Sequence, residues 1–373
     1  MTAHSIIAAL NLIEQQHSLL FFLVDMSLKS SVLITAAYVI QCFIPSRNPS
    51  LRSTAWMTAF AALLLLPLFH EIVPAISFSY IYQSALEEFA GSMTSAMAFA
   101  TRVDAVASSL FGVALSYLLL SALLSCYLLS GIAKVILLSR QARPFRHEVA
   151  TQCLQRLQQT NGCDRTVELL VSPKISSPLT WGVWRHKILF PLAAHGWSDE
   201  LLQQTISHEL AHVQRGDWIL QIFSRVVVAL YWINPLVWIA HRKLLIETEK
   251  ACDDVAVENS GSPLSYAQNL LQLANSFSAG RAMLAPALLG IQSSLSQRIR
   301  HILKQEVNRH SSDTSHILPS LLIAAMVVAP FSALTIQLEQ KEPTMTRLER
   351  PVIAVSFFPN DSKEYFSLMA EFR

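Results

Sequence analysis

The sequence predicts a mainly α-helical membrane protein, with about four transmembrane helices and a domain of helices and strands inserted before the last of them. Of its 373 residues, 52% are hydrophobic and only 14% are charged, whereas soluble domains carry about 25% charged residues. Four stretches are apolar over the roughly 20 residues that a helix needs to cross a bilayer. A long and more polar block separates the third stretch from the fourth, and this block is the inserted domain.

The four predicted spans divide the chain. The first ends near residue 44 and starts between residues 19 and 30, where Asp25 and Lys29 lie one helical turn apart and fit the outer interface. The other three cover residues 55–76, 105–130 and 317–336, and Pro67 predicts a kink in the second. We therefore expect an N-terminal membrane domain at 1–130, the inserted domain at 131–314, a fourth transmembrane helix at 315–336 and a short tail at 337–373.

Basic residues predict the orientation in the membrane. The loop between the first two spans holds Arg47 and Arg52 and no acid. Four basic residues follow the third span: Lys134, Arg140, Arg143 and Arg146. Because cytoplasmic loops are enriched in Lys and Arg, both regions are expected in the cytoplasm. The protein is then multi-pass, with the inserted domain inside and the tail outside.

Within the inserted domain, the sequence pattern changes from helix to strand and back. Residues 145–159 predict a helix that Asn161-Gly162 ends, and residues 166–171 predict a short strand. Residues 174–191 predict a loop and then a strand, and a helix follows from the N-cap Ser198 to Gly216. The strand before that helix is either an ordinary edge strand or one that pairs with a substrate backbone, as in zinc peptidases.

Residues 217–240 are apolar enough to suggest a fifth span. However, Arg225, Asn234 and Pro235 are costly or disruptive in the middle of a bilayer. One crossing here would also separate a metal ligand located after residue 240 from the ligands before it. We therefore expect a membrane-associated pair of elements that breaks at Asn234-Pro235.

The pentapeptide His208-Glu-Leu-Ala-His212 predicts the chemistry. Two histidines four apart lie on one face of a helix, where both rings can reach one Zn²⁺. Glu209 would then face a water whose pKa the metal lowers, and would take its proton as catalytic base. The alternative is a solvated helix with two surface histidines, but an apolar stripe along the flanking residues indicates a helix that is buried on one side. The motif therefore predicts peptide-bond hydrolysis.

A third metal ligand is required, and the residues alone leave it open. The candidates that carry a suitable side chain are His186, His195, His241, Glu247, Glu249, Asp253, Asp254 and Glu258. Glu249 and Asp253 are four apart, so they share one face of a predicted helix. One could bind the metal while the other accepts the free N–H of a ligand histidine. Alternatively, both belong to a helix whose acids face water.

Further motifs give the chain a resemblance to a known family. They surround the pentapeptide in this order: Ser177-Pro-Leu-Thr-Trp-Gly182, Ile188-Leu-Phe-Pro191, Arg215-Gly-Asp217, Trp232-Ile-Asn-Pro-Leu-Val-Trp238 and Glu249-Lys-Ala-Cys-Asp253. Together they resemble the BlaR/MecR-type membrane zinc peptidases, which are antirepressor signal transducers. The resemblance covers roughly residues 27–336 in organisation and is most specific over residues 177–257.

The resemblance implies a gluzincin-like α+β zinc protease domain on the cytoplasmic side of a bacterial inner membrane. It implies Zn²⁺ ligands at His208, His212 and Glu249, Glu209 as catalytic base, and Asp253 as the hydrogen-bond partner of a ligand histidine. The implied substrate is a cytoplasmic or membrane-proximal protein, such as a transcriptional repressor. β-Lactam-sensing members carry an extracellular penicillin-binding domain with an S-x-x-K motif. Residues 337–373 contain no such motif, so we do not expect this chain to sense an antibiotic directly.

Other functions remain as alternatives. A housekeeping membrane protease, of the quality-control or prenyl-peptide type, would use the same catalytic motif. A receptor or scaffold with a structural zinc would need a fourth protein ligand, and none presents itself in the sequence. Nucleic-acid binding is not expected, since the net charge is +2 and no basic run stands out. The lipid bilayer is an expected partner, and a homodimer or a separate extracytoplasmic sensor stays open.

Overall fold

The computed structural model describes residues 3–72, 76–79, 96–160, 162–278, 285–304, 324, 326, 334–337 and 355–357. The chain divides into two compact units. One comprises Met1–Leu33, Ala61–Ala122 and Leu321–Arg373, and the other comprises Ile34–Phe60 and Leu123–Ser320. The second unit therefore combines two stretches that are well separated along the chain.

Three long helices carry the apolar segments: α1 (Ala3–Phe43), α2 (Pro49–Ile72) and α3 (Ala96–Gln141). Within them, Phe22–Phe43, Pro49–Phe69 and Leu115–Gln141 are long and apolar enough to cross a membrane. The first three predicted spans are therefore helical. In α1, Lys29 Nζ lies 2.7 Å from Asp25 Oδ2, so the two charges do pair.

Two predicted span boundaries need correction. The second span was expected to reach residue 76, but α2 ends at Ile72 and residues 76–79 form a strand. Among the described residues of α3, the apolar segment is Leu115–Gln141, so it continues beyond the predicted end at residue 130. It extends past Lys134 and Arg140, whose long side chains can carry their charges to the end of an apolar helix.

A three-stranded sheet belongs to the first unit. Its strands are β1 (Ile76–Ser79), β6 (Leu334–Gln337) and β7 (Val355–Phe357), in the order β6-β1-β7. β1 pairs in parallel with β6 and antiparallel with β7. This sheet brings residues that follow α2 together with residues near the C-terminus.

The predicted fourth transmembrane helix, 315–336, lies mostly outside the described residues. Ala324 and Met326 are helical, but the expectation of helix up to residue 336 is wrong, since Leu334–Gln337 is strand β6. Pro330 disfavours helix in the preceding turn, and the β-branched Thr335 and Ile336 favour a strand.

The second unit contains a four-stranded sheet in the order β2-β3-β5-β4. The strands are β2 (Arg143–Pro144), β3 (Val167–Ser172), β4 (Leu179–Trp181) and β5 (His186–Pro191). β5 pairs in parallel with β3 and antiparallel with β4. The strand that precedes the motif helix is therefore interior, and the edge strand is β4, in a stretch that was expected to be loop. Because both sides of β5 are paired, β4 offers the edge for a further strand.

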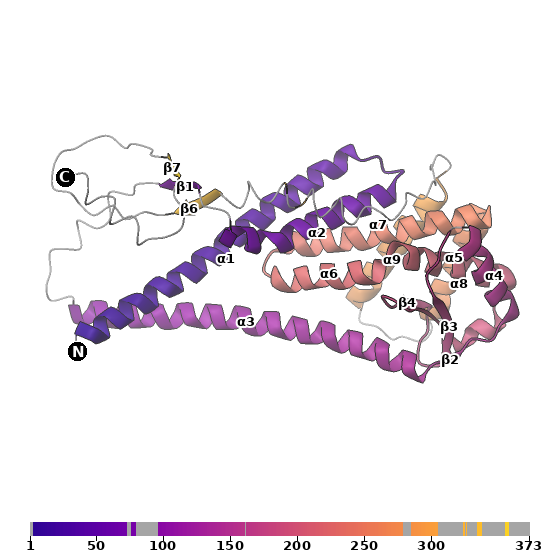
Figure 1. Cartoon of the computed structure of the whole chain (residues 1–373), viewed down its shortest axis with the longest axis horizontal. Helices are drawn as coiled ribbons and strands as arrows, with labels where there is room; N and C mark the ends of the chain where they lie inside the picture. The colour runs from indigo at the N-terminus through magenta and orange to yellow at the C-terminus, as the bar shows by residue number, and fades with distance from the viewer. Residues whose placement is uncertain are drawn as a thin grey trace. The chain divides into compact units, whose positions relative to one another are not determined.

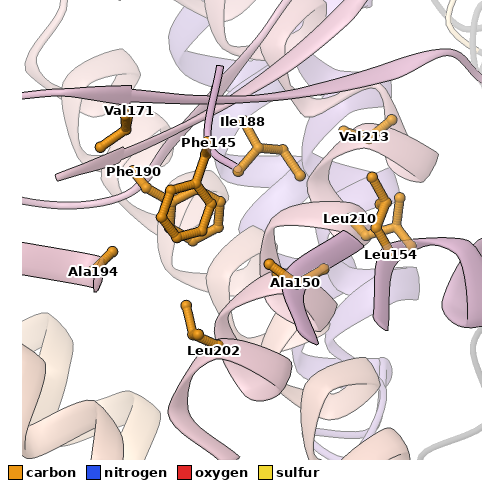
Figure 2. Close-up of a cluster of buried hydrophobic side chains, with 11 residues drawn as sticks. Phe145, Ala150, Leu154, Val171, Ile188, Phe190, Ala194, Leu202, Leu210 and Val213 are labelled. Carbon is orange, nitrogen blue, oxygen red and sulfur yellow. The ribbon is translucent and has the colours of Figure 1, made fainter. Parts of the chain in front are cut away.

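A hydrophobic core joins this sheet to two helices, α4 (Glu148–Thr160) and α5 (Asp199–Arg215). Figure 2 shows its side chains pointing inward, with the rings of Phe145 and Phe190 stacked. Their centroids are 5.0 Å apart. Ile188 of β5 and Leu210 of α5 are both buried in the same cluster. The core therefore fixes α5 against the sheet, and a 3-10 helix (Leu192–Gly196) connects the two.

The expected break within residues 217–240 is confirmed. α6 (Asp217–Leu230) and α7 (Pro235–Ser260) are separate helices that run side by side (Figure 1). The Asn234 side chain caps α7 by accepting the N–H of Leu236 at 3.0 Å, and Pro235 occupies the first turn. With 14 residues, α6 is only about 21 Å long and does not span a bilayer core of about 30 Å. Two further helices, α8 (Pro263–Ser278) and α9 (Ala285–Ile302), belong to the described part of this unit.

Candidate metal centre

Two packed helices, α5 and α7, supply the candidate ligands. Ser198 caps α5 by accepting the N–H of Leu201, and Asp199 and Glu200 occupy its first turn, where acids favour the positive helix end. Gly216 ends the helix with a φ of 67°, a left-handed conformation that glycine adopts without strain. These signals place the pentapeptide in the last two turns of α5, facing α7.

The three predicted ligands converge. His208 Nε2 lies 3.3 Å from His212 Nε2. The two carboxylate oxygens of Glu249, on α7, lie 3.7 Å from His208 Nε2 and 3.8 Å from His212 Nε2. A tetrahedral Zn²⁺ with Zn–N bonds of about 2.05 Å holds two nitrogen ligands about 3.3 Å apart. The donor set and its spacing therefore fit one divalent transition metal.

The candidate centre has three ligands and is partly open. In the part of the chain that the structure describes, no fourth His, Cys, Asp or Glu joins His208, His212 and Glu249. The Glu249 side chain is 33% exposed, while each histidine side chain is 12% exposed. Structural zinc sites usually have four protein ligands, whereas catalytic sites keep a position for water or substrate. This arrangement is typical of a catalytic centre.

Glu209 is oriented by the edge strand. It is buried in α5 directly after His208. The Thr180 hydroxyl, in β4, donates a hydrogen bond of 2.5 Å to Glu209 Oε2. β4 thus contacts the predicted catalytic base through a side chain, and among the described strands it stands at the edge of the sheet.

An acid that follows α5 orients His212. Asp217 Oδ2 lies 2.8 Å from His212 Nδ1, and Asp217 is 1% exposed. Arg215 Nε lies 3.4 Å from the same oxygen. When Nδ1–H donates to this carboxylate, Nε2 keeps its lone pair for a metal. The left-handed turn at Gly216 brings Asp217 back beside the histidine.

A second group of polar side chains surrounds His208. Its Nδ1 lies 3.1 Å from the Tyr266 hydroxyl and 3.3 Å from Asp253 Oδ1. Tyr266, on α8, donates to the same Asp253 oxygen at 2.8 Å. Arg298, on α9, donates two hydrogen bonds to Asp253, at 2.6 and 2.8 Å, and its Nη1 lies 2.9 Å from Glu249 Oε2. Arg298 therefore joins the carboxylate of Glu249, a candidate metal ligand, to the carboxylate beside His208.

These contacts shift the protonation of the metal-free site. Burial lowers the pKa of His208, but hydrogen bonds to Asp253 and Glu249 outweigh it and raise the pKa to about 10. Burial raises the pKa of Glu249, whereas the charge of Arg298 and the bond to His208 lower it to about 2. The pKa of Asp253 is also lowered, against burial, by Arg298. The carboxylates are therefore ionised, and a metal must displace a proton from His208.

The other candidate ligands lie elsewhere. Glu247 pairs with Lys250 at 3.1 Å, and Asp254 pairs with His301 of α9 at 2.9 Å. His186 begins β5 and His195 lies in the 3-10 helix. Burial and the charge of Arg225 lower the pKa of His241, on α7, to about 4. Glu258 is exposed near the end of α7.

Sequence reasoning missed four residues that contact the site: Thr180, Asp217, Tyr266 and Arg298. Thr180 and Asp217 stood inside motifs noted in the sequence, but spacing alone gave them no role. Tyr266 and Arg298 follow α7 and come from helices that carry no recognisable metal motif. A search for acidic or hydroxyl partners just after the pentapeptide could have found Asp217.

Comparison with known proteins adds an independent finding. A family described as BlaR1 peptidase M56 matches residues 21–302. The regulatory protein BlaR1 of Bacillus licheniformis is 37% identical over 82 residues, which are 22% of this chain and 14% of that protein. The methicillin resistance mecR1 proteins of Staphylococcus aureus and Staphylococcus epidermidis are each 23% identical over 188 residues, or 48% of this chain and 32% of theirs. The alignments thus cover less than two thirds of the length of these relatives.

Proposed function

We propose that this chain, which belongs to the BlaR1 peptidase M56 family, is a membrane-bound zinc endopeptidase that acts in regulatory signalling. One observation carries the proposal: three ligand side chains converge with the spacing of a tetrahedral zinc site, and a glutamate precedes the second histidine by three residues. His208, His212 and Glu249 would hold the ion. A bound Zn²⁺ would supply Lewis acidity and lower the pKa of a water molecule.

Glu209 moves the proton in the proposed reaction. Its carboxylate accepts a proton from the attacking water, whose oxygen bonds to the peptide carbonyl carbon. The carbon–nitrogen bond then breaks, and Glu209 gives the proton to the leaving amine. Thr180 positions the carboxylate through its 2.5 Å hydrogen bond. Asp217 and Asp253 hold the two histidine rings with Nε2 toward the centre.

The edge of β4 is the proposed substrate-binding strand. An extended peptide can add to it by backbone hydrogen bonds. Because Thr180 of β4 also contacts Glu209, a peptide paired there would lie close to the catalytic carboxylate. Pairing in this way recognises backbone, so it would suit an extended or unfolded segment of a protein.

Two contacts support a topology with the metal centre in the cytoplasm. The N-terminal turn of α2 contacts α5, because the Arg215 guanidinium donates to Ser50 and Ser53 at 3.0 and 2.7 Å. That turn and the metal centre are then on one side of the membrane, and Arg47 and Arg52 favour the cytoplasm. β1 pairs with β6 and β7, which suits an extracytoplasmic position for both residues 76–79 and the tail.

The proposed substrate is a cytoplasmic or membrane-proximal protein, such as a transcriptional repressor. The resemblance to regulatory and resistance proteins favours one regulatory substrate over general protein turnover. We also propose the predicted division into a membrane domain at 1–130, a peptidase domain at 131–314, a further span that begins near residue 315 and ends before strand β6 (Leu334–Gln337), and a tail. A homodimer or an extracytoplasmic partner protein would then convey the signal.

Replacement of Glu209 by Gln tests the enzymatic proposal. Cleavage in cells should fall by roughly a hundredfold to ten-thousandfold, the contribution of a general base, while purified protein keeps its metal. Quantitative proteomics of strains with the wild-type and E209Q proteins would report the substrate as a protein that accumulates uncleaved. Glu258→Gln is the matched control, because Glu258 is exposed near the end of α7. Full activity of E209Q would refute the mechanism, and many stabilised membrane proteins would indicate a housekeeping protease.

A further inference from the structure

A cavity of about 460 Å³ lies between the α1–α2 turn and α7. Its walls include Tyr38, Gln41, Trp56 and two cations, Arg52 and Lys243. None of the metal ligands lines it, and no carboxylate does. It is therefore a separate site with a positive lining, and its use does not depend on the proposed peptidase activity.

The position of the cavity suggests what could reach it. One apolar segment ends at Phe43 and the next begins at Pro49, so the cavity lies at the level where two membrane helices meet the lipid head groups. Phe43 is 82% exposed and also lines the cavity. Tyr38 and Trp56 pack edge to face at its wall, with ring centroids 4.9 Å apart. Aromatic side chains are enriched at this level of membrane proteins.

Polar atoms in the wall lack partners. Gln41 is 4% exposed. Its Nε2 donates to the Arg52 carbonyl at 2.8 Å, but in the described part of the chain nothing donates to its Oε1. The Tyr38 hydroxyl is also buried without a hydrogen bond among the described residues. Buried polar atoms are normally paired, so a small rotation of these two side chains toward the cavity would let a ligand with both a donor and an acceptor complete this wall.

The charges that line the cavity indicate that the acceptor group of the ligand is an anion. Arg52 already donates through Nη1 to the carbonyls of Gln41 and Ile44, at 3.3 and 3.2 Å, and its Nε lies 3.5 Å from Glu247 Oε2. Lys243 is exposed, and no described residue forms an ion pair with it. An anionic group in the cavity would thus meet the Lys243 ammonium and the Tyr38 hydroxyl, while a hydroxyl beside it could donate to Gln41 Oε1.

We propose that this cavity binds the phosphoglycerol head group of a phosphatidylglycerol molecule from the surrounding leaflet. The phosphate accepts from Lys243 and Tyr38, and a glycerol hydroxyl donates to Gln41. The acyl chains leave along the exposed apolar side chain of Phe43. Anionic lipids attract basic groups at the membrane surface, and here the unpaired neutral atoms add selectivity for the head group.

The test uses the full-length protein in phosphatidylcholine vesicles that contain a small fraction of spin-labelled lipid. Electron spin resonance then measures the immobilised fraction of labelled phosphatidylglycerol, phosphatidylcholine and phosphatidic acid. Phosphatidylglycerol should be preferred over phosphatidylcholine by about threefold or more, the factor that one hydrogen bond of ordinary net strength gives. It should also be preferred over phosphatidic acid, which lacks the head-group glycerol hydroxyl that would donate to Gln41.

Variants distinguish lipid binding in the cavity from attraction by the general surface charge of the protein. Lys243→Gln and Tyr38→Phe should each remove most of the preference, and the second deletes a single oxygen. Gln41→Leu should bring phosphatidylglycerol down to the level of phosphatidic acid. Arg242→Gln is the matched control, because it removes the adjacent exposed charge outside the cavity wall, and it should keep the preference. Thermal unfolding checks that each variant is folded.

Three results would overturn the proposal. Wild-type protein could hold phosphatidylglycerol no better than phosphatidylcholine. Arg242→Gln could lose as much preference as Lys243→Gln, which would indicate unspecific charge. Soluble glycerol phosphate at millimolar concentration could displace the labelled lipid completely, which would make the ligand a free phosphate ester instead of a membrane lipid.

Discussion

Removing the charge of Asp217 should weaken zinc binding through His212. The carboxylate lies 2.8 Å from His212 Nδ1 and is 1% exposed, so water does not screen the contact. A hydrogen bond to a charged group contributes about 1.5–3 kcal/mol, and one between neutral groups contributes about 0.5–1.5 kcal/mol. Asp217→Asn keeps an acceptor and loses only the difference, about 1–1.5 kcal/mol, which is about a fivefold to tenfold loss of affinity.

Asp217→Ala removes the acceptor altogether and should cost about tenfold to a hundredfold in affinity, the usual range for partners of this kind. The dissociation constant of Zn²⁺ is measured on detergent-solubilised protein by competition with a chelator of known affinity. If a charged hydrogen bond orients His212, zinc affinity should fall in the order wild type, Asp217→Asn, Asp217→Ala.

Asp199→Asn is the matched control for this experiment. Asp199 lies in the first turn of the same helix and is exposed, so its loss costs a few tenths of a kcal/mol of helix stability at most and leaves zinc affinity unchanged. If Asp217→Asn bound Zn²⁺ within about twofold of the wild type while remaining folded, the assigned role of Asp217 would be wrong.

Three further predictions concern the same unit. Arg298→Met leaves the two carboxylates that it bridges without a cation, so the metal-free protein should lose about 3–5 kcal/mol in urea unfolding, and Arg298→Lys, which keeps the charge, should lose less; equal losses would contradict a stabilising role of the charge itself. The pKa of His208 is raised to about 10 in the metal-free protein, so its stabilisation is complete below about pH 6.5 and is lost as the pH rises through about 10. Zinc titration at pH 8 should accordingly release at least one proton, measured by calorimetry in buffers of different ionisation enthalpy, and no release would contradict this pKa. Gly182 has a φ of 118°, and an added Cβ would lie 2.2 Å from the Arg185 carbonyl oxygen. Gly182→Ala should therefore destabilise the β4–β5 connection by more than about 1 kcal/mol, as measured by thermal unfolding. A variant as stable as the wild type would show that the turn relaxes.

The parts of the site that are local in sequence could be predicted. His208, Glu209 and His212 lie within two turns of one helix, so helical geometry alone fixes their relation. The boundaries of that helix followed from Ser198 and Gly216, and the break at Asn234-Pro235 followed from the same local chemistry. Such features depend on backbone conformation within a few residues, which sequence patterns report well.

Long-range relations could not be derived in this way. Glu249 reaches the histidines because α6 and the turn after it return the chain, and spacing alone left other acids as alternatives. Tyr266 and Arg298 contact His208 and Asp253 from α8 and α9, but nothing in their neighbourhood marks which helix face points inward. The resemblance to a family supplied Glu249 and Asp253, and it carried no role for Tyr266 or Arg298.

The sheet shows a third kind of limit. β4 has only three residues. A strand this short is too brief to show the alternation of hydrophobic and polar residues by which strands are predicted. Strand order also depends on which partner each strand chooses, and β5 is paired on both sides. The sequence therefore placed the edge on the strand next to the motif helix, whereas the free edge belongs to the strand before it.

The unit that holds the candidate metal ligands is discontinuous, since it combines Ile34–Phe60 with Leu123–Ser320. A water-soluble fragment cut from the second stretch alone would leave the Arg215 guanidinium without its two serine hydroxyls and Glu247 without Arg52. We therefore expect that the proposed peptidase unit cannot be excised from the membrane helices and assayed in isolation. Purification of an active protein will therefore require the α1–α2 hairpin, and with it the detergent or lipid that this hairpin needs.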